Sequence, residues 1–313
     1  MRKDLLTILE HEYGCRDLGP LTECLGTEID YDKRAGKLKQ SQRKYIEESC
    51  KRFAIDRTNT TPARSDLVLD SPTDDDALCK ADQHKYMQMV GCLNYIANGT
   101  RPDISAITSV LGQFMQVAGR EHFKAARRVF EYLKGTAGQC LTFRRGCATP
   151  NRFHIACDAS HGDRGVTGNG WRRSRSGIVI MMNGAAISWI SRSQTCVAIS
   201  TAEAEYIALC LAAQEQNWLR EIVQFLGHEQ TEPTVVYEDN DAARLIAEND
   251  LSVKRSKSID IRYHYVRERV ADGQIRIERI DTKDQPADLL TKNLPRDKFE
   301  HCRRIVMGGD ETF

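Results

Sequence analysis

The chain has 313 residues, of which 28% are charged and 41% hydrophobic, and 45 Lys and Arg nearly balance 44 Asp and Glu at a formal charge of +1. This composition is that of a globular protein in water, and the length favours two domains. The near-neutral charge excludes a global attraction to nucleic acid, so any such binding must come from local basic patches.

The sequence contains no sign of a membrane or secretory segment. No run of 18 or more apolar residues is present, so we expect no membrane-spanning helix. The charged N-terminal segment MRKDLLTILEHEYG does not follow a secretory signal pattern. The 11 cysteines are an odd number without a C-x-x-C pair, which favours a reducing compartment. We therefore expect an intracellular protein, cytoplasmic or nuclear and not secreted.

The first half of the chain predicts a mostly helical α+β domain. From apolar spacing and Gly/Pro punctuation the predicted elements are, in chain order, a helix over 1–12, a hairpin over 20–40, a helix over 41–55 opened by Ser41, helices over 82–98, 102–117 and 120–134, and a strand over 138–151. This last strand ends in a Gly/Pro-containing connector. We place a domain boundary there, between 1–147 and 148–313.

The segment over 56–76 separates two of these helices. It has two prolines, few large apolar residues and the acidic triplet Asp74–Asp76. This composition predicts an exposed, partly disordered loop whose acids are solvated.

The second half alternates strands and helices. Its predicted elements are a strand over 152–160, a hairpin over 176–193 around Asn183-Gly184, a helix over 199–227, a strand over 232–239, helices over 241–249 and 257–273, a strand over 274–281, and helices over 284–294 and 295–307. Three consecutive strands, followed by strands that alternate with helices, predict an α/β fold with a five-stranded mixed sheet covered by helices.

One long helix organises this half. Ser200 followed three residues later by Glu203 is a capping-box pattern, and Gly227 ends the helix. Glu205 lies one turn in, on the largely apolar side of the helix. Because an unpaired buried charge is costly, Glu205 either occupies a partly exposed flank or binds a metal ion.

Three further acids lie at or after the ends of predicted elements. Asp158 comes after the first strand, Asp239 after the fourth, and Asp288 lies in the helix that follows the fifth. Each also has an ordinary structural alternative. Asp158 could form an Asx turn, Asp239 could cap the next helix, and Asp288 could interact with its own helix dipole.

Together the four acids predict a metal site. If the first and fourth strands are neighbours, their ends lie side by side, and a helix packed across the sheet brings Glu205 to the same edge. Crowded carboxylates repel one another and take up protons, whereas divalent cations remove this penalty. Hard oxygen ligands suit Mg²⁺ or Mn²⁺. Two such ions about 4 Å apart can hold the attacking water and the leaving oxygen of a phosphodiester.

Several segments of the chain carry a specific resemblance. The segments CDAS, AISWISRSQTCVAISTAEAEYIAL, YEDNDAA and IDTKDQPADLLTK resemble the successive motifs of the ribonuclease H domain in copia-type (pseudovirus) retrotransposon Pol polyproteins. In the first half, LGTEIDYDKRAGKLKQSQRKYIE, MVGCLNYIANGTRPDI and ARRVFEYLKGT are similar to the segments that follow the polymerase active site in the same family. The resemblance covers nearly the whole chain.

The resemblance implies a ribonuclease H-like fold for 148–313 and a reverse transcriptase thumb and connection remnant for 1–147. It implies endonucleolytic hydrolysis of the RNA strand of RNA–DNA hybrids. The catalytic, metal-binding acids of the family fall on Asp158, Glu205, Asp239 and Asp288.

Two basic sets are candidates for holding the backbone of the hybrid, with a solvated basic face as the alternative. They are Arg172, Arg173 and Arg175, and Lys254, Arg255 and Lys257.

The sequence also departs from the family pattern. No Y-V-D-D polymerase motif occurs, so a polymerase palm would have to come from a longer polyprotein or in trans. Where the family usually reads D-A-D-W-A, this chain has CDASHGDRG. The alternative function is therefore that of a catalytically inactive or domesticated fragment that only binds nucleic acid as a scaffold. A transposase or integrase is disfavoured, because those enzymes typically end in a late Glu.

Overall fold

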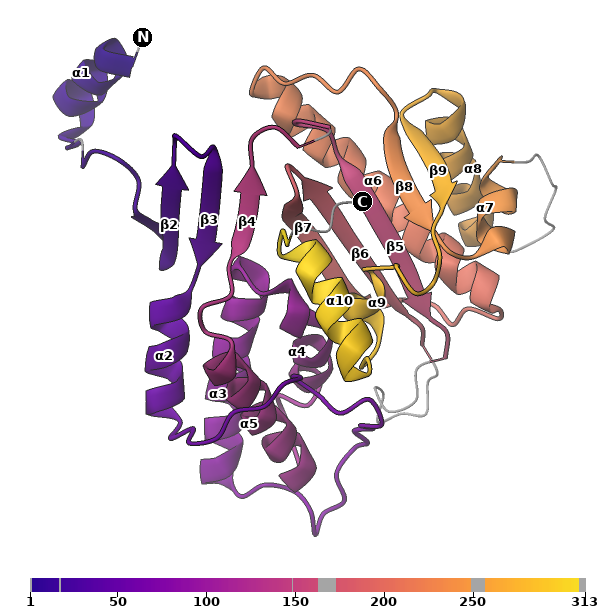
Figure 1. Cartoon of the computed structure of the whole chain (residues 1–313). Helices are drawn as coiled ribbons and strands as arrows, with labels where there is room; N and C mark the ends of the chain where they lie inside the picture. Colours follow the sequence, from indigo (N-terminus) through magenta and orange to yellow (C-terminus); the bar gives the residue numbers. More distant parts are fainter. Residues whose placement is uncertain (1, 17, 148, 163–172, 249–256, 310–313) are drawn as a thin grey trace.

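The computed structural model describes residues 2–16, 18–147, 149–162, 173–248 and 257–309. Within these ranges the chain forms two β-sheets and the helices that surround them (Figure 1). None of the described helices combines the length and the apolar character that crossing a bilayer requires.

The first sheet is antiparallel throughout. Its strands, in spatial order, are β1 (Glu23–Cys24), β2 (Thr27–Asp32), β3 (Lys37–Ser41) and β4 (Leu141–Arg144). The predicted hairpin is confirmed, since β2 and β3 pair from Glu28–Ser41 to Asp32–Lys37. Asp32 Oδ1 accepts the backbone N–H of Arg34 at 2.9 Å. This Asx-type bond closes the turn, as short polar side chains commonly do.

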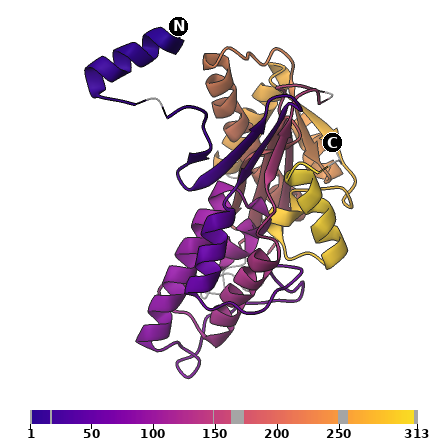
Figure 2. The ribbon, with the colours of Figure 1, turned by 60° about the vertical axis from the view of Figure 1, so that its left-hand side comes forward.

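Five helices and a 3₁₀ turn complete the first half. They are α1 (Arg2–Tyr13), α2 (Arg43–Arg52), α3 (Lys80–Gly99), η1 (Pro102–Ile104), α4 (Ser105–Gly112) and α5 (Arg120–Gly135). The predicted opening of α2 at Ser41 is wrong: Ser41 belongs to β3, and its hydroxyl donates to Glu28 Oε2 at 3.2 Å. Helix α1 stands apart from the rest of the molecule in both views (Figures 1 and 2).

The segment over 56–76 has no helix or strand and most of its residues are exposed, as expected, but a few in its middle are buried. Ala63 and Leu69 are buried in the core. The Arg128 side chain on α5 donates to Thr61 Oγ1 at 3.2 Å. The prediction of an exposed loop is therefore confirmed for most of the segment, while a few small and apolar residues fix its middle against the helices. Asp74 and Asp75 are exposed, as predicted.

The second sheet has the order β7-β6-β5-β8-β9. Its strands are β5 (His154–Ser160), β6 (Arg175–Met182), β7 (Ala185–Ser193), β8 (Thr234–Glu238) and β9 (Ile275–Arg279). Strands β5, β6 and β7 pair antiparallel, whereas β8 runs parallel to β5 and β9 parallel to β8. The predicted turn between β6 and β7 is confirmed, with Asn183 and Gly184 both at positive φ. The predicted mixed sheet is therefore confirmed.

Helices cover both faces of this sheet. The remaining helices are α6 (Thr201–Phe225), α7 (Asp241–Glu248), α8 (Lys257–Ala271), α9 (Asp288–Thr291) and α10 (Arg296–Val306). Alternation along β6 separates the two faces: Ile178 and Ile180 join a core with α6, whereas Val179 and Met181 join a core with α9, α10 and the first half. The result is the ribonuclease H-like arrangement of a five-stranded mixed sheet with flanking helices.

The two halves are connected by more than the chain between β4 and β5. The backbone N–H of Thr142 donates to Met307 O at 3.0 Å, and that of Arg144 donates to Asn183 O at 2.9 Å. The rings of Tyr132 on α5 and Phe299 on α10 lie 5.5 Å apart. The two halves therefore share one apolar core. The boundary near 147 falls between the two sheets and stays a prediction.

Candidate active site

The strands bring two of the predicted acids to one edge of the second sheet. Asp158 is near the end of β5, and Asp239 directly follows β8. These strands are parallel, and Ala156 is level with Tyr237. Two residues further along each strand, Asp158 and Asp239 therefore lie side by side.

Helix α6 supplies the third acid. The Ser200 hydroxyl accepts the N–H of Glu203 at 3.2 Å, while the Glu203 carboxylate accepts the N–H of Ile199 at 2.8 Å. This reciprocal cap starts the helix as the sequence predicts. Glu205, two residues later, is buried with only 4% of its surface exposed. Glu203, which caps the helix, and Glu205, which belongs to the candidate site, therefore have different roles although they lie within one turn of α6.

The three carboxylates of Asp158, Glu205 and Asp239 converge. One oxygen from each lies within 4.8 Å of the other two. We call this group the rim carboxylates. Asp158 and Glu205 are buried, and Asp239 is half-buried. Two structural alternatives are excluded by the contacts: Asp158 accepts from the Thr291 hydroxyl rather than forming an Asx turn, and Asn240, not Asp239, caps α7 through the N–H of Ala243 at 3.0 Å.

Two of the rim carboxylates, Asp158 and Glu205, have raised pKa values. Burial and then the Asp158 carboxylate raise the pKa of Glu205 to about 11. Burial and then Asp288 raise the pKa of Asp158 to about 7. Within the described part of the chain, Glu205 Oε2 is buried without a hydrogen-bond partner. A hard cation such as Mg²⁺ or Mn²⁺ would supply that partner and relieve the repulsion, so the residues present fit such an ion.

Asp288, the fourth predicted acid, has different partners from the other three. Asp288 is fully buried at the start of α9 and lies beside Asp158, but it is not in the converging group. Its Oδ1 forms an ion pair with Lys292 and its Oδ2 with Lys298. The Lys292 ammonium also lies 3.7 Å from Asp158 Oδ2. Asp288 is thus neutralised by two lysines where the sequence predicted a fourth metal ligand.

A glycine lets α9 lie this close to the site. Gly177 on β6 pairs with Asp158 across the sheet. A Cβ on Gly177 would lie 2.6 Å from Thr291 Cγ2 and 2.8 Å from Ala287 O. The missing side chain therefore allows α9 to pack directly on the sheet, which places the Thr291 hydroxyl against Asp158.

Sequence reasoning missed several residues of this site. Glu238 is 1% exposed, burial raises its pKa to about 8, and its Oε2 accepts from Cys157 Sγ at 3.3 Å. Lys292 and Lys298 were also missed. The sequence did contain signals for two of them, since Glu238 directly precedes Asp239 and Lys292 follows Asp288 by four residues. Only the packing of α9 against β5 shows that they share one site.

The predicted basic sets are only partly described. Arg172, Lys254 and Arg255 lie outside the described residues, and Lys257 starts α8 without a described side chain. Arg173 is half-buried.

Arg175 requires a correction. It is 1% exposed, and its Nη1 donates to Ser109 Oγ on α4 at 2.8 Å. Arg175 therefore connects α4 to the sheet and does not lie on a surface that could hold a nucleic acid backbone.

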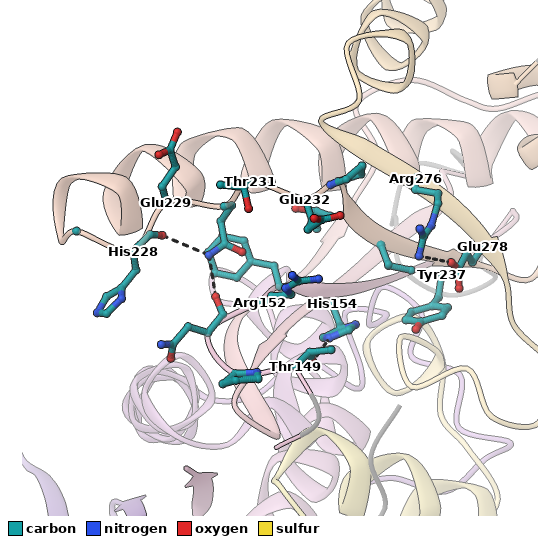
Figure 3. A pocket seen from close by; sticks show the side chains of 18 residues that line it. Thr149, Arg152, His154, His228, Glu229, Thr231, Glu232, Tyr237, Arg276 and Glu278 are labelled. Carbon is teal, nitrogen blue, oxygen red and sulfur yellow. Dashed lines mark hydrogen bonds and ion pairs between the residues drawn. The ribbon is translucent and has the colours of Figure 1, made fainter. Parts of the chain in front are cut away.

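A separate hollow of about 550 Å³ lies toward the other end of β5 (Figure 3). It is lined by 149–154, by the loop over 227–233 and by parts of β8 and β9. Its charges largely balance, since Arg276 pairs with Glu278 at 2.7 Å, and Arg152, Glu229 and Glu232 are also among its lining residues. None of the predicted site residues lines it, so we assign it no part in the chemistry.

Comparison with known proteins identifies relatives that cover most of the chain. No protein-family model matches. The retrovirus-related Pol polyprotein from transposon TNT 1-94 of Nicotiana tabacum is 37% identical over 303 residues, which is 95% of this chain and 22% of that protein. The Pol polyprotein from transposon RE1 of Arabidopsis thaliana is 33% identical over 266 residues, 83% of this chain and 17% of that protein. The chain thus spans about a fifth of the length of these relatives.

Solved structures are more distant. The foamy viral protease-reverse transcriptase in complex with an RNA/DNA hybrid is 12% identical, with a TM-score of 0.44 over 88% of this chain and 30% of that one. The ribonuclease H1 of the archaeon Halobacterium salinarum NRC-1 is 14% identical, with a TM-score of 0.33 over 45% of this chain and 94% of that one. The sequence relatives decide the assignment: the chain belongs to the retrovirus-related Pol polyproteins of copia-type retrotransposons and corresponds to their C-terminal part, with the end of the reverse transcriptase and the ribonuclease H domain.

Proposed function

We propose that this chain is a retrotransposon-derived ribonuclease H, which hydrolyses the RNA strand of RNA–DNA hybrids endonucleolytically with Mg²⁺ or Mn²⁺. The observation that carries the proposal is the convergence of the rim carboxylates within 4.8 Å at the edge of the second sheet. Three buried or half-buried acids from three separate elements do not stabilise the fold by meeting there. Their meeting is explained by a cation that all of them bind.

The residues of the chain divide the work of this site. A bound divalent cation would supply positive charge against the phosphodiester during attack by water. Asp158, Glu205 and Asp239 would hold it, and Glu205 would contribute its unpaired Oε2. Thr291 donates to Asp158, and the Thr282 hydroxyl donates to Asp239 Oδ2 at 2.8 Å. These two hydroxyls fix the orientation of the carboxylates, as partners of metal ligands commonly do.

One observation favours the rival function, that of an inactive or domesticated fragment that only binds nucleic acid as a scaffold. Asp288, the fourth acid, has both oxygens in ion pairs with lysines. If Asp288 cannot leave these pairs, the site keeps three of its four acids and lacks the fourth metal ligand that the resemblance implies.

The proposed partners follow from the proposed reaction. The substrate is an RNA–DNA hybrid, recognised through contacts to 2′-hydroxyls across the minor groove. A polymerase palm from a longer polyprotein, or supplied in trans, is the proposed protein partner. We further propose that the protein acts inside the cell, where such hybrids are made.

The test is a cleavage assay on a labelled RNA–DNA hybrid with Mg²⁺ or Mn²⁺. Wild type is compared with Glu205→Gln and Asp239→Asn, and with Glu221→Gln as a control at an exposed position on the same helix. We expect cleavage by wild type and Glu221→Gln and none by the two site variants. Equal cleavage by all four proteins would end the enzyme proposal, and hybrid binding without cleavage by wild type would favour the scaffold function.

A further inference from the structure

Lys292 holds a position that its own helix does not explain. Asp288 and Lys292 are four residues apart, a spacing at which opposite charges commonly pair. However, the Lys292 ammonium is shared: it also lies 3.7 Å from Asp158 Oδ2, on a strand far away in the sequence. It therefore bridges one of the rim carboxylates and the acid that stands outside them.

This is the place that a second cation would occupy. Asp158 belongs to the converging group, and its Oδ2 also lies 3.7 Å from the Lys292 ammonium that pairs with Asp288 Oδ1. A cation between Asp158 and Asp288 would contact the same oxygens that Lys292 now contacts. Lys292 and a metal ion cannot both occupy this position, because each would contact the same two carboxylate oxygens.

Lys292 is also able to leave. Its side chain is 43% exposed, whereas the side chain of Asp288 is fully buried. The Lys298 ammonium is more enclosed, at 26% exposure, and is held by Thr282 O at 2.7 Å as well as by Asp288. Asp288 would therefore keep one lysine partner if Lys292 moved toward solvent.

We propose that Lys292 is a built-in cation that occupies the second cation position between Asp158 and Asp288. The resting site then binds one divalent ion, at Asp158, Glu205 and Asp239, and takes up a second only when Lys292 is displaced. Lys292 is a charge-compensating residue of the site and does not itself act on the substrate. The inference rests on the proposed function, since it requires that the rim carboxylates bind a divalent ion.

The experiment counts ions rather than turnover. Mn²⁺ binding to the full chain is measured by titration calorimetry and by the EPR signal of free Mn²⁺. We expect one tightly bound ion in wild type and two in Lys292→Met, with the second ion bound about tenfold or more tightly than in wild type because an adjacent positive charge has been removed. Lys292→Gln is expected to behave in the same way and serves if Lys292→Met does not fold, which circular dichroism shows.

Two variants separate a shared position from a general effect of charge. Lys298→Met removes an equal charge from Asp288 but not from between Asp288 and Asp158, so it should still bind one ion. Lys292→Met combined with Asp288→Asn should return to one ion. Two ions in wild type, one ion in Lys292→Met, or two ions in Lys298→Met would each overturn the inference. Absence of Mn²⁺ binding in all variants would overturn the proposed metal site as well, whereas one ion in both wild type and Lys292→Met would overturn the role of Lys292 alone.

Discussion

Arg101 and Asp103 form a buried ion pair in the first half of the chain, whereas Asp158 and Glu205 are buried next to each other at the edge of the second sheet. The pair in the first half is complete. Arg101 Nε and Nη2 donate to the two oxygens of Asp103 at 2.8 and 2.7 Å, and Arg101 Nη1 donates to Thr136 O at 3.0 Å. The Tyr132 hydroxyl donates to Asp103 as well.

The two sites shift the acidity of their carboxylates in opposite directions. Burial by itself raises the pKa of Asp103, but the Arg101 guanidinium more than reverses this, so that the pKa lies below its ordinary value. At the rim, burial and neighbouring acids act together and raise the pKa of Asp158 to about 7. A buried acid with a complete set of partners supports the fold, whereas buried acids without enough partners indicate a ligand.

The largest expected effect comes from Asp158→Asn. We expect hybrid cleavage to fall by more than about a hundredfold, because the interaction of a bound cation with its substrate is worth several kcal/mol. The stability of the metal-free protein should not fall, since the change removes a repelling charge. Cleavage rates and urea unfolding in EDTA measure the two effects. Near-wild-type cleavage would contradict the assignment of Asp158 to the site.

Asp103→Asn should lower the stability of the protein and leave the metal site unaffected. It leaves the buried Arg101 charge without its counterion, so we expect the free energy of unfolding to fall by about 3–5 kcal/mol. The fraction of protein that remains folded should bind Mn²⁺ as wild type does. The control is Asp66→Asn, which breaks an exposed ion pair with Arg64 and should leave the urea midpoint unchanged. A loss of Mn²⁺ binding in folded Asp103→Asn would mean that the two sites are not independent.

The two sites also predict opposite limbs of a stability–pH curve for the metal-free protein. Asp103 has a lowered pKa in the folded state, so its contribution is present above its unfolded pKa near 3.8 and is lost as the pH falls below it. Asp158 and Glu238 have raised pKa values of about 7 and 8, so stability is fully present below their unfolded values of 3.8 and 4.5 and is lost as the pH rises through 7 to 8.

Each pKa unit corresponds to about 1.4 kcal/mol and each of the two pKa values rises by roughly three units, so the alkaline loss should be on the order of 4 kcal/mol for each group. Urea unfolding in EDTA from below pH 3.8 to above pH 8 measures both limbs, because this range includes the unfolded value of Asp103 and the raised values of Asp158 and Glu238. Asp158→Asn should flatten the alkaline limb, and Asp103→Asn should flatten the acid limb. A wild-type protein that gains stability from pH 5 to 8 would contradict the sign at the rim.

The smallest expected effect is that of Gly177→Ala, which disturbs the packing of α9 on the sheet without changing any charge. The added methyl group would meet Thr291 Cγ2 at 2.6 Å and Leu290 Cβ at 2.9 Å, so we expect a loss of about 1–3 kcal/mol in urea unfolding. Gly91→Ala on α3 is the control: its Cβ would meet nothing within 4 Å, and a helical Gly→Ala change should stabilise by about 0.5–1 kcal/mol. Equal effects of the two substitutions would show that the close contact with α9 is not needed.

The local elements were predictable from sequence because their signals are local. Ser200 and Glu203 cap α6 through bonds that span a few residues, and Asn183-Gly184 adopts the positive φ angles that only a few residue types tolerate. The order of strands and helices predicted the mixed sheet. The positions of the acids in that order predicted a common site, and three of them, Asp158, Glu205 and Asp239, do converge.

What the sequence could not decide was which charges would have partners. Arg175 looked like part of a basic surface run, but β6 is central in the sheet and its side chain lies buried against Ser109. Asp288 looked equal to the other acids until α9 placed Lys292 and Lys298 on its two oxygens. Pattern and spacing determine the elements and the edge where the acids gather, because those depend on neighbours along the chain. The pairing of each charge depends on side chains brought together from distant segments, and only the tertiary structure determines it.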